Sequence, residues 1–97
     1  MAKGYIISLY REINDTQRLT EYSALAGPAV EAAGGKFLAR GGNVVAYEHG
    51  LNERTVIIEF ESYDIAKQLY DSDLYQEALA KLGDAVVRDF RVVEGVD

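Results

Sequence analysis

Apolar, strand-forming residues are concentrated in four short segments of the chain, each bounded by polar or turn-forming residues. The four segments are residues 3–10, 36–48, 54–60 and 86–94. Valine, isoleucine, tyrosine and phenylalanine in such runs are typical of β-strands. The second segment contains Gly41 and Gly42, so we expect a bulge there, with at least one positive φ. Residues 50–53 then predict a turn that joins this strand to the next.

A longer segment between the first two strands carries apolar residues at helical spacing. These residues are Leu19, Tyr22, Leu25, Ala29 and Ala33. Asn14, Asp15 and Thr16 before them are residues that favour the start of a helix. Pro28 lies inside the segment and is expected to kink or divide the helix, because proline has no backbone N–H to donate. Gly34 is expected to end it.

A second helical segment begins after the third strand. Ser62 can cap its start, and Ile65, Ala66, Leu69 and Tyr70 share one face. Asp71 and Ser72 predict a break, with Ser72 capping a further helical stretch that ends at Gly83.

The predicted order is therefore β-α-β-β-α-β, which is the order of a ferredoxin-like α+β fold. We expect one domain over residues 1–97, with a four-stranded antiparallel sheet covered on one face by the helices. The other face is also apolar in the sequence pattern, since Ile6 and Ile7 point to opposite faces and so do Val56 and Ile57. An open apolar sheet would exceed the roughly 300–600 Å² patch that monomers tolerate. A homodimer, with one sheet facing the other, is the predicted solution.

Composition narrows the classes of function. Sixteen acidic and ten basic residues give a net charge of −6, and no basic face is evident, which argues against nucleic-acid and membrane partners. The chain has no cysteine and one histidine, His49, placed beside the predicted turn, so we expect neither a metal site nor a cofactor. The first residues are too short and too polar for a signal peptide or membrane span, and we expect a cytoplasmic protein.

Several stretches resemble a known family over nearly the whole chain. They are GYIISLYREIND, GGKFLARGG, VIIEFESYDIAKQLYDSDLYQEAL and the closing VVEGVD. They are similar to the family called domain of unknown function 1330, which resembles the dimeric α/β barrel superfamily. The resemblance implies two ferredoxin-like protomers packed sheet to sheet, and no particular reaction: the superfamily includes cofactor-free quinol-forming monooxygenases, haem-dependent enzymes and proteins without known activity. Many members have proline where this chain has Asp73, which still suits the first turn of a helix.

Two charged residues are candidates for chemistry. Arg40, bracketed by glycine pairs, can direct its planar guanidinium at a carboxylate or enolate oxygen, and the alternative is an ordinary ion pair. Glu59 interrupts an apolar strand, on the face shared with Ile57. If desolvated, it would have a raised pKa suited to a general base. The alternative for Glu59 is an ion pair with Arg88 or Arg91.

The candidate ligand-binding residues are Arg40, Tyr22, Tyr70, Ser72 and Tyr75. We expect the bend at the glycines, the Pro28 break and the break at residues 71–72 to converge on one pocket for a small anionic or partly apolar molecule. The tyrosines can instead be core residues. Three classes of function remain open: a homodimeric binding protein, a cofactor-independent monooxygenase or isomerase-like enzyme, and a structural or regulatory dimer without a ligand.

Overall fold

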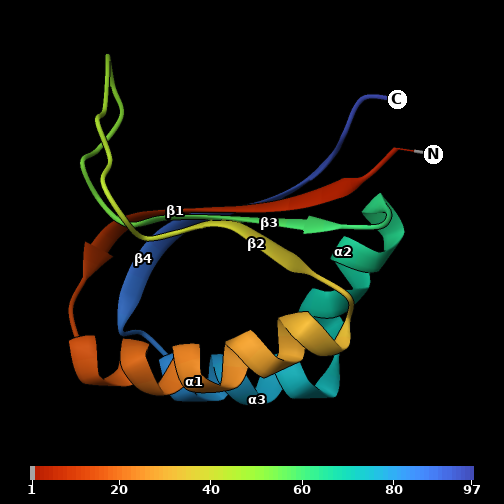
Figure 1. The fold of residues 1–97 in the computed structure, drawn as a ribbon. Helices are drawn as coiled ribbons and strands as arrows, with labels where there is room; N and C mark the ends of the chain where they lie inside the picture. Colours follow the sequence, from red (N-terminus) through yellow and green to blue (C-terminus); the bar gives the residue numbers. More distant parts are fainter. Residues whose placement is uncertain (1) are drawn as a thin grey trace.

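Four strands and three helices follow one another in residues 2–97, the part of the chain that the computed structural model describes. They are β1 (Gly4–Ile13), α1 (Thr16–Ala32), β2 (Lys36–Arg40), β3 (Thr55–Phe60), α2 (Tyr63–Asp71), α3 (Asp73–Leu82) and β4 (Val86–Glu94). The strands form one antiparallel sheet in the order β2-β3-β1-β4. Helices α1 and α3 lie side by side under one face of it (Figure 1). The predicted α+β fold is confirmed.

Each helix begins at a capping side chain that the sequence predicted. Asp15, Ser62 and Ser72 accept hydrogen bonds from the backbone N–H groups three residues later, at 3.0, 3.2 and 3.3 Å. Such caps satisfy N–H groups that have no partner inside the helix. The break at Ser72 lets the chain change direction, so that α3 can run along α1. No helix within residues 2–97 has both the length and the apolar composition needed to cross a membrane.

Helix α1 passes through Pro28 without dividing, contrary to one of the two expected outcomes. Proline removes one backbone hydrogen bond from a helix. Buried residues on both sides of it, Ala26, Ala29 and Val30, hold the two turns against the sheet. The packing of this face therefore keeps the helix continuous.

The prediction that one strand extends from residue 36 to residue 48 is wrong. Strand β2 ends at Arg40, because Gly41 and Gly42 have φ values of 77° and 84°, which turn the chain out of the sheet. The positive φ was expected, but the bulge was placed wrongly. The irregular pairing with β3 lies between Phe37 and Ala39 instead.

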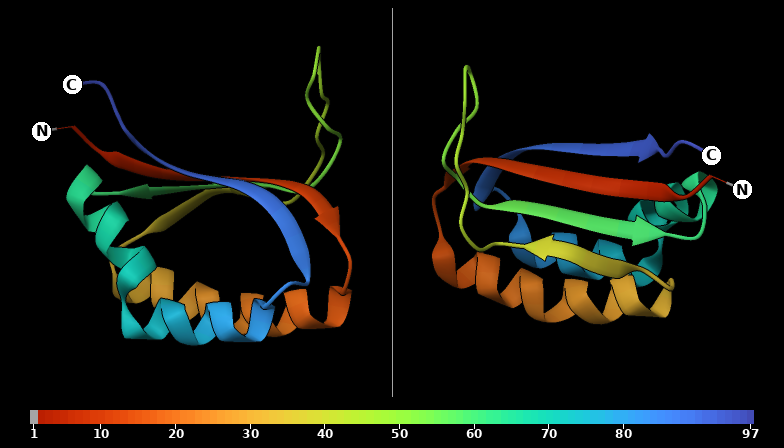
Figure 2. Two further views of the ribbon diagram at one scale, coloured as in Figure 1. Left: turned by 180° about the vertical axis from the view of Figure 1, so that it is seen from behind. Right: turned by 45° about the horizontal axis from the view of Figure 1, so that its top comes forward.

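Residues 41–53 form a projecting segment that we call the arm. The arm rises from the sheet on the side away from the helices (Figures 1 and 2). Its tip is closed by a hydrogen bond from Gly50 N to Tyr47 O at 2.9 Å, so the turn lies earlier than the predicted residues 50–53. Ala46 N also donates to Asn52 Oδ1 at 2.7 Å. The apolar side chains of Val45, Tyr47 and Leu51 are exposed along the arm.

The two faces of the sheet differ in burial. The face toward the helices, here the core face, carries the buried Ile6, Tyr10, Val56, Ile58 and Phe60. Within residues 2–97, no helix lies against the opposite face, here the open face (Figure 2). Its apolar residues are partly or largely exposed, and they include Tyr5, Ile7, Leu9, Ile57 and Val93. The predicted apolar second face is therefore present in the monomer.

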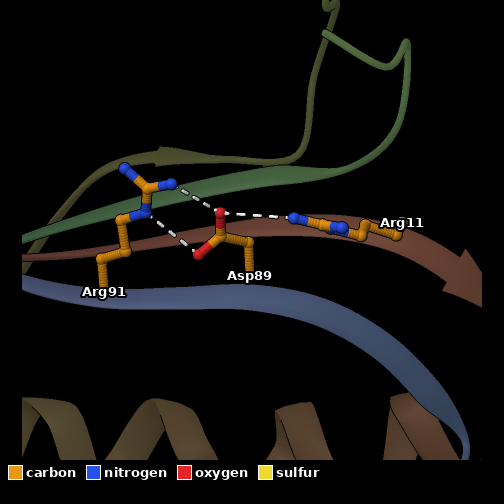
Figure 3. A network of polar contacts seen from close by, with 3 residues as sticks. All are labelled: Arg11, Asp89 and Arg91. Atoms are coloured by element: carbon orange, nitrogen blue, oxygen red, sulfur yellow. Dashed lines mark hydrogen bonds and ion pairs between the residues drawn. The ribbon is translucent and has the colours of Figure 1, made fainter. Parts of the chain in front are cut away.

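A charged network lies on this open face. Arg91 donates from Nε and Nη2 to the two oxygens of Asp89, at 3.0 and 2.8 Å, and Arg11 Nη2 lies 3.7 Å from Oδ2 (Figure 3). Hydrogen bonds from Arg91, with the charges of both arginines, hold the pKa of Asp89 below its ordinary value. Two guanidinium groups thus share one carboxylate on the open face.

Candidate functional site

A cavity of about 30 Å³ lies between the core face of the sheet and the helices. Space of this size can hold a water molecule or two. Much of its wall is apolar, formed by Ile6, Ala26, Phe37, Val56, Ile58 and Phe90. The polar groups that reach it come from three strands and two helices, so residues far apart in the sequence meet here.

Arg88 of β4 is a half-buried cation of the pocket. It lies two residues from Phe90 along the strand, on the same face, and therefore points toward the helices. Its Nη1 donates to the hydroxyls of Tyr10 and Tyr22, both at 3.2 Å, and its Nη2 lies 3.4 Å from the Tyr75 hydroxyl. Its hydrogen bonds to side chains within residues 2–97 therefore go to neutral hydroxyl groups.

Tyr22 of α1 and Tyr75 of α3 are joined by a hydrogen bond between their hydroxyls, and their rings meet edge to face with centroids 6.0 Å apart. Burial raises the pKa of the Tyr75 hydroxyl. For Arg88, burial acts to lower the pKa, but Tyr22 and Tyr75 outweigh it and hold that pKa above its ordinary value. At neutral pH the pocket therefore holds a protonated Tyr75 and a charged Arg88.

Arg40 lies at the exposed edge of the pocket. Its guanidinium stacks over the Phe37 ring, 4.2 Å from the centroid, and donates one hydrogen bond of 3.3 Å to Ser23 O. It also packs against α1 where Gly27 has no side chain, since a Cβ there would lie 3.3 Å from Arg40 Nη2. These contacts are few, so Arg40 can move without breaking the core.

Arg54, directly before β3, is a third cation of the pocket wall. Its Cζ lies 5.8 Å from the centroid of the Tyr10 ring. Its Nε is buried and has no hydrogen-bond partner within the described part of the chain. A buried N–H without a partner costs free energy, so this group would gain from an acceptor placed in the pocket.

Three guanidinium groups therefore surround a pocket whose lining contains no aspartate or glutamate. Within residues 2–97, neither Arg40, Arg54 nor Arg88 forms an ion pair. The alternative of an ordinary ion pair for Arg40 is thus not what the structure shows. In a chain of net charge −6, this is a local concentration of unpaired positive charge.

The other predicted site residues lie elsewhere. Tyr70 is outside the pocket lining, although its ring contacts that of Tyr75 with centroids 5.6 Å apart. Ser72 caps α3 and donates to Leu69 O at 2.7 Å, beside a separate hollow. The expected convergence of three irregularities is therefore wrong: the arm base and the Pro28 region of α1 meet at Arg40, but the break at residues 71–72 does not join them.

Glu59 lies on the open face, as expected from its place beside Ile57, and so it is on the opposite side of the sheet from the pocket. It accepts a hydrogen bond of 3.4 Å from the Tyr5 hydroxyl. The predicted alternative, an ion pair with Arg88 or Arg91, is wrong. Arg88 points to the other face, and Arg91 is paired with Asp89.

Sequence reasoning missed Arg88, Arg54 and Tyr10 as pocket residues. A signal was present for Arg88, because it occupies the same strand phase as Val86, Phe90 and Val92, whose side chains pack toward the core. A charged residue in an apolar phase indicates a buried polar site. Arg54 gave no comparable signal, since it precedes its strand and its position depends on where the arm ends.

The fold and site together define a small α+β protein of ferredoxin-like type, with an arginine-lined pocket under its sheet. The chain belongs to the family described as domain of unknown function DUF1330, whose model matches residues 3–96. The resemblance seen in the sequence is thereby confirmed. No curated protein matches the chain.

Solved structures share the fold. A protein of unknown function from Rhodopseudomonas palustris is 21% identical, with a TM-score of 0.71, over 96% of this chain and 80% of that one. A Caulobacter crescentus protein provisionally named an antibiotic biosynthesis monooxygenase is 17% identical, with a TM-score of 0.59, over 99% and 91%. A dimeric ferredoxin-like protein of unknown function from Thermobifida fusca is 17% identical, with a TM-score of 0.56, over 98% and 92%. At these identities the likeness establishes the fold alone.

Proposed function

We propose that this protein is a homodimer that binds a small organic anion in the pocket between sheet and helices. The observation that carries the proposal is the set of three unpaired arginines, Arg40, Arg54 and Arg88, around a pocket without a carboxylate. Guanidinium groups bind carboxylates and related oxyanions through paired, charge-assisted hydrogen bonds. An anion would offset part of this positive charge and supply the acceptor that Arg54 Nε lacks.

The walls restrict the rest of the ligand. Phe37, Phe90 and the aliphatic residues favour an apolar body, preferably a flat one, beside the charged group. The space inside the pocket is only about 30 Å³, so an aromatic carboxylate fits only if a side chain at the edge moves. Arg40 suits that role, because its one hydrogen bond to Ser23 is long and exposed. The ligand class is therefore a small carboxylate or enolate with a short apolar or aromatic part.

A cofactor-independent enzyme of monooxygenase or isomerase type is the second candidate function. The Tyr22 and Tyr75 hydroxyl pair beside Arg88 favours it, since such a group can donate a hydrogen bond or a proton to an enolate oxygen. The raised pKa of Tyr75 makes it a donor and a poor base. Glu59, the other candidate base, faces away from the pocket. Binding without turnover is the better-supported function.

The enzyme alternative is tested with pyruvate in D2O. Exchange of its methyl hydrogens, which lie next to the carbonyl, would establish an enzyme if Tyr75→Phe abolished that exchange.

The binding proposal is tested with formate, acetate and benzoate as a size series, by calorimetry and thermal shift. A ligand at a hundred times its Kd adds about 2.7 kcal/mol to the free energy of unfolding. Arg54→Met should weaken benzoate binding at least ten-fold without destabilising the fold, because no hydrogen bond to its Nε is lost. Arg40→Met should weaken binding too, whereas Arg18→Met, in a surface ion pair with Asp84, is the matched control.

Two results would contradict the proposal. If none of the three anions stabilises the protein, the pocket does not bind small organic anions. Equal benzoate affinity in wild type, Arg54→Met and Arg40→Met would make the arginines structural and place any binding elsewhere.

A further inference from the structure

The arm connects two of the pocket arginines. It leaves the sheet directly after Arg40 and returns directly before Arg54. Its base is held by two backbone hydrogen bonds, from Gly41 N to Thr55 O at 3.1 Å and from Tyr10 N to Arg54 O at 3.0 Å. Any force that positions the arm therefore acts on the backbone of both arginines.

The arm also projects where a second copy of the chain would lie. It rises on the side of the open face, away from the helices (Figures 1 and 2). Sheets packed face to face are about 10 Å apart. Residues 42–47 can span at most about 20 Å when extended. An arm of that length would reach beyond the gap between the two sheets and lie alongside the partner's sheet.

The surface of the arm suits this contact. Val45, Tyr47 and Leu51 are exposed by 73%, 78% and 53% in the monomer, in a segment that makes no core. A groove of about 400 Å³ separates the arm from its own open face, between Leu51 and His49 on one side and Leu9 on the other. A partner that covers the apolar open face would also fill this groove, so one contact buries both surfaces.

The distribution of charge also favours a second copy of the chain as the partner that covers the open face. On the open face two arginines, Arg11 and Arg91, share the single carboxylate of Asp89 (Figure 3). The arm carries Glu48 and Glu53 and no arginine or lysine. An acidic arm laid on this pair of arginines is electrostatically complementary, and two identical copies provide both partners twice.

From these contacts we propose that the arm docks on a second copy of this chain and thereby positions Arg40 and Arg54 for the anion. The inference rests on the proposed function and deepens it, because it makes anion binding depend on assembly. Coupling of this kind is reciprocal: if dimer formation tightens anion binding, the anion tightens the dimer by the same factor.

The test measures the dimer Kd by sedimentation and the benzoate Kd by calorimetry. Leu51→Ser and Tyr47→Ser should each weaken the dimer about ten-fold, since buried apolar anchors dominate such contacts. Leu74→Ser is a matched control, because Leu74 lies on α3 in the helix layer and is exposed to nearly the same extent, 51% against 53% for Leu51. It should change the dimer Kd less than two-fold. At concentrations where the arm variants are monomeric, benzoate should bind at least three-fold more weakly than to wild type.

Each failure has a separate meaning. Arm variants that dimerise as wild type does would overturn the arm contact, even if benzoate binds. Arm variants that dissociate but bind benzoate unchanged would overturn the link to the arginines and leave the anion pocket intact. Wild type that dimerises through the arm but binds none of the three anions would overturn the proposed function and with it the coupling.

Discussion

Arg88 shows how much the chemistry of this pocket depends on the strand phase of one residue. A half-buried guanidinium that contacts only neutral hydroxyls and aromatic rings has lost water without gaining a counter-charge. Several weak hydrogen bonds compensate for part of that cost. A carboxylate would compensate for the rest. The same residue one position earlier or later would lie on the open face, where Arg91 forms an ordinary ion pair.

The hydroxyl of Tyr75 predicts a specific response to alkaline pH. Its pKa is raised by burial, so the folded protein keeps this proton above pH 10, where the unfolded chain releases it. The unfolded state then binds fewer protons, and the free energy of unfolding falls as pH rises. Between pH 9 and 11, urea unfolding should show a steeper fall for wild type than for Tyr75→Phe, by at most about 1.4 kcal/mol per pH unit.

The comparison of slopes isolates this one proton, because the six other tyrosines are common to both proteins. Tyr75→Phe also removes a hydrogen bond to Tyr22, which lowers stability at every pH. Parallel curves above pH 10 would therefore show that Tyr75 ionises normally in the folded protein, whatever the offset between them.

At the level of elements, the β2 end and the arm are governed by two adjacent glycines. Both have positive φ, which costs about 1–2 kcal/mol for a residue with a side chain. A Cβ at Gly41 would lie 3.0 Å from Arg54 Nη1, whereas a Cβ at Gly42 meets nothing within 4 Å. We expect Gly41→Ala and Gly42→Ala to lose similar stability in thermal unfolding. Only Gly41→Ala should weaken benzoate binding, because the methyl group displaces Arg54.

The two variants control for each other. Both place a side chain at a positive φ, but only the one at Gly41 would contact Arg54. If the two variants bind benzoate equally, the guanidinium of Arg54 does not take part in binding. If neither loses stability, the arm base adjusts freely and cannot transmit assembly to the pocket.

Caps and helix ends were predictable because their chemistry is local. Asp15, Ser62 and Ser72 satisfy N–H groups within three residues, so the sequence alone identifies them. The end of β2 was not predictable in this way. Residues 43–48 include Val44, Val45 and Tyr47, which have high strand propensity, but a strand also needs a partner with free backbone groups. Whether one exists depends on the path of the chain after Gly42.

The pocket was predictable in part for the same reason. Arg40, Tyr22 and Tyr75 were identified from composition and from nearby irregularities, and all three line it. Glu59 was assigned to the correct face, but the face that holds the pocket follows from helix placement. Arg54 and Arg88 lie beside Tyr10 because of the strand order, and no local sequence pattern indicates that order.

For the molecule as a whole, the open face and the arm lead to a prediction about mass. Light scattering at micromolar concentration should give about twice the chain mass of 10.7 kDa. The physical reason is the exposed apolar surface, which water disfavours. A folded monomer over the whole micromolar range would contradict the homodimer and the arm contact together, while leaving anion binding to be judged by calorimetry.

The strand order also has a consequence for biosynthesis. Gly4 of the first strand pairs with Phe60 on one side and with Glu94 on the other. Ribosomes add about 5–20 residues each second, so the first strand waits on the order of 5–20 s for its last neighbour. During that interval the edge of β1 that pairs with β4 is uncovered. A nascent chain of this topology therefore keeps an unpaired strand edge exposed for longer than a chain of local hairpins would.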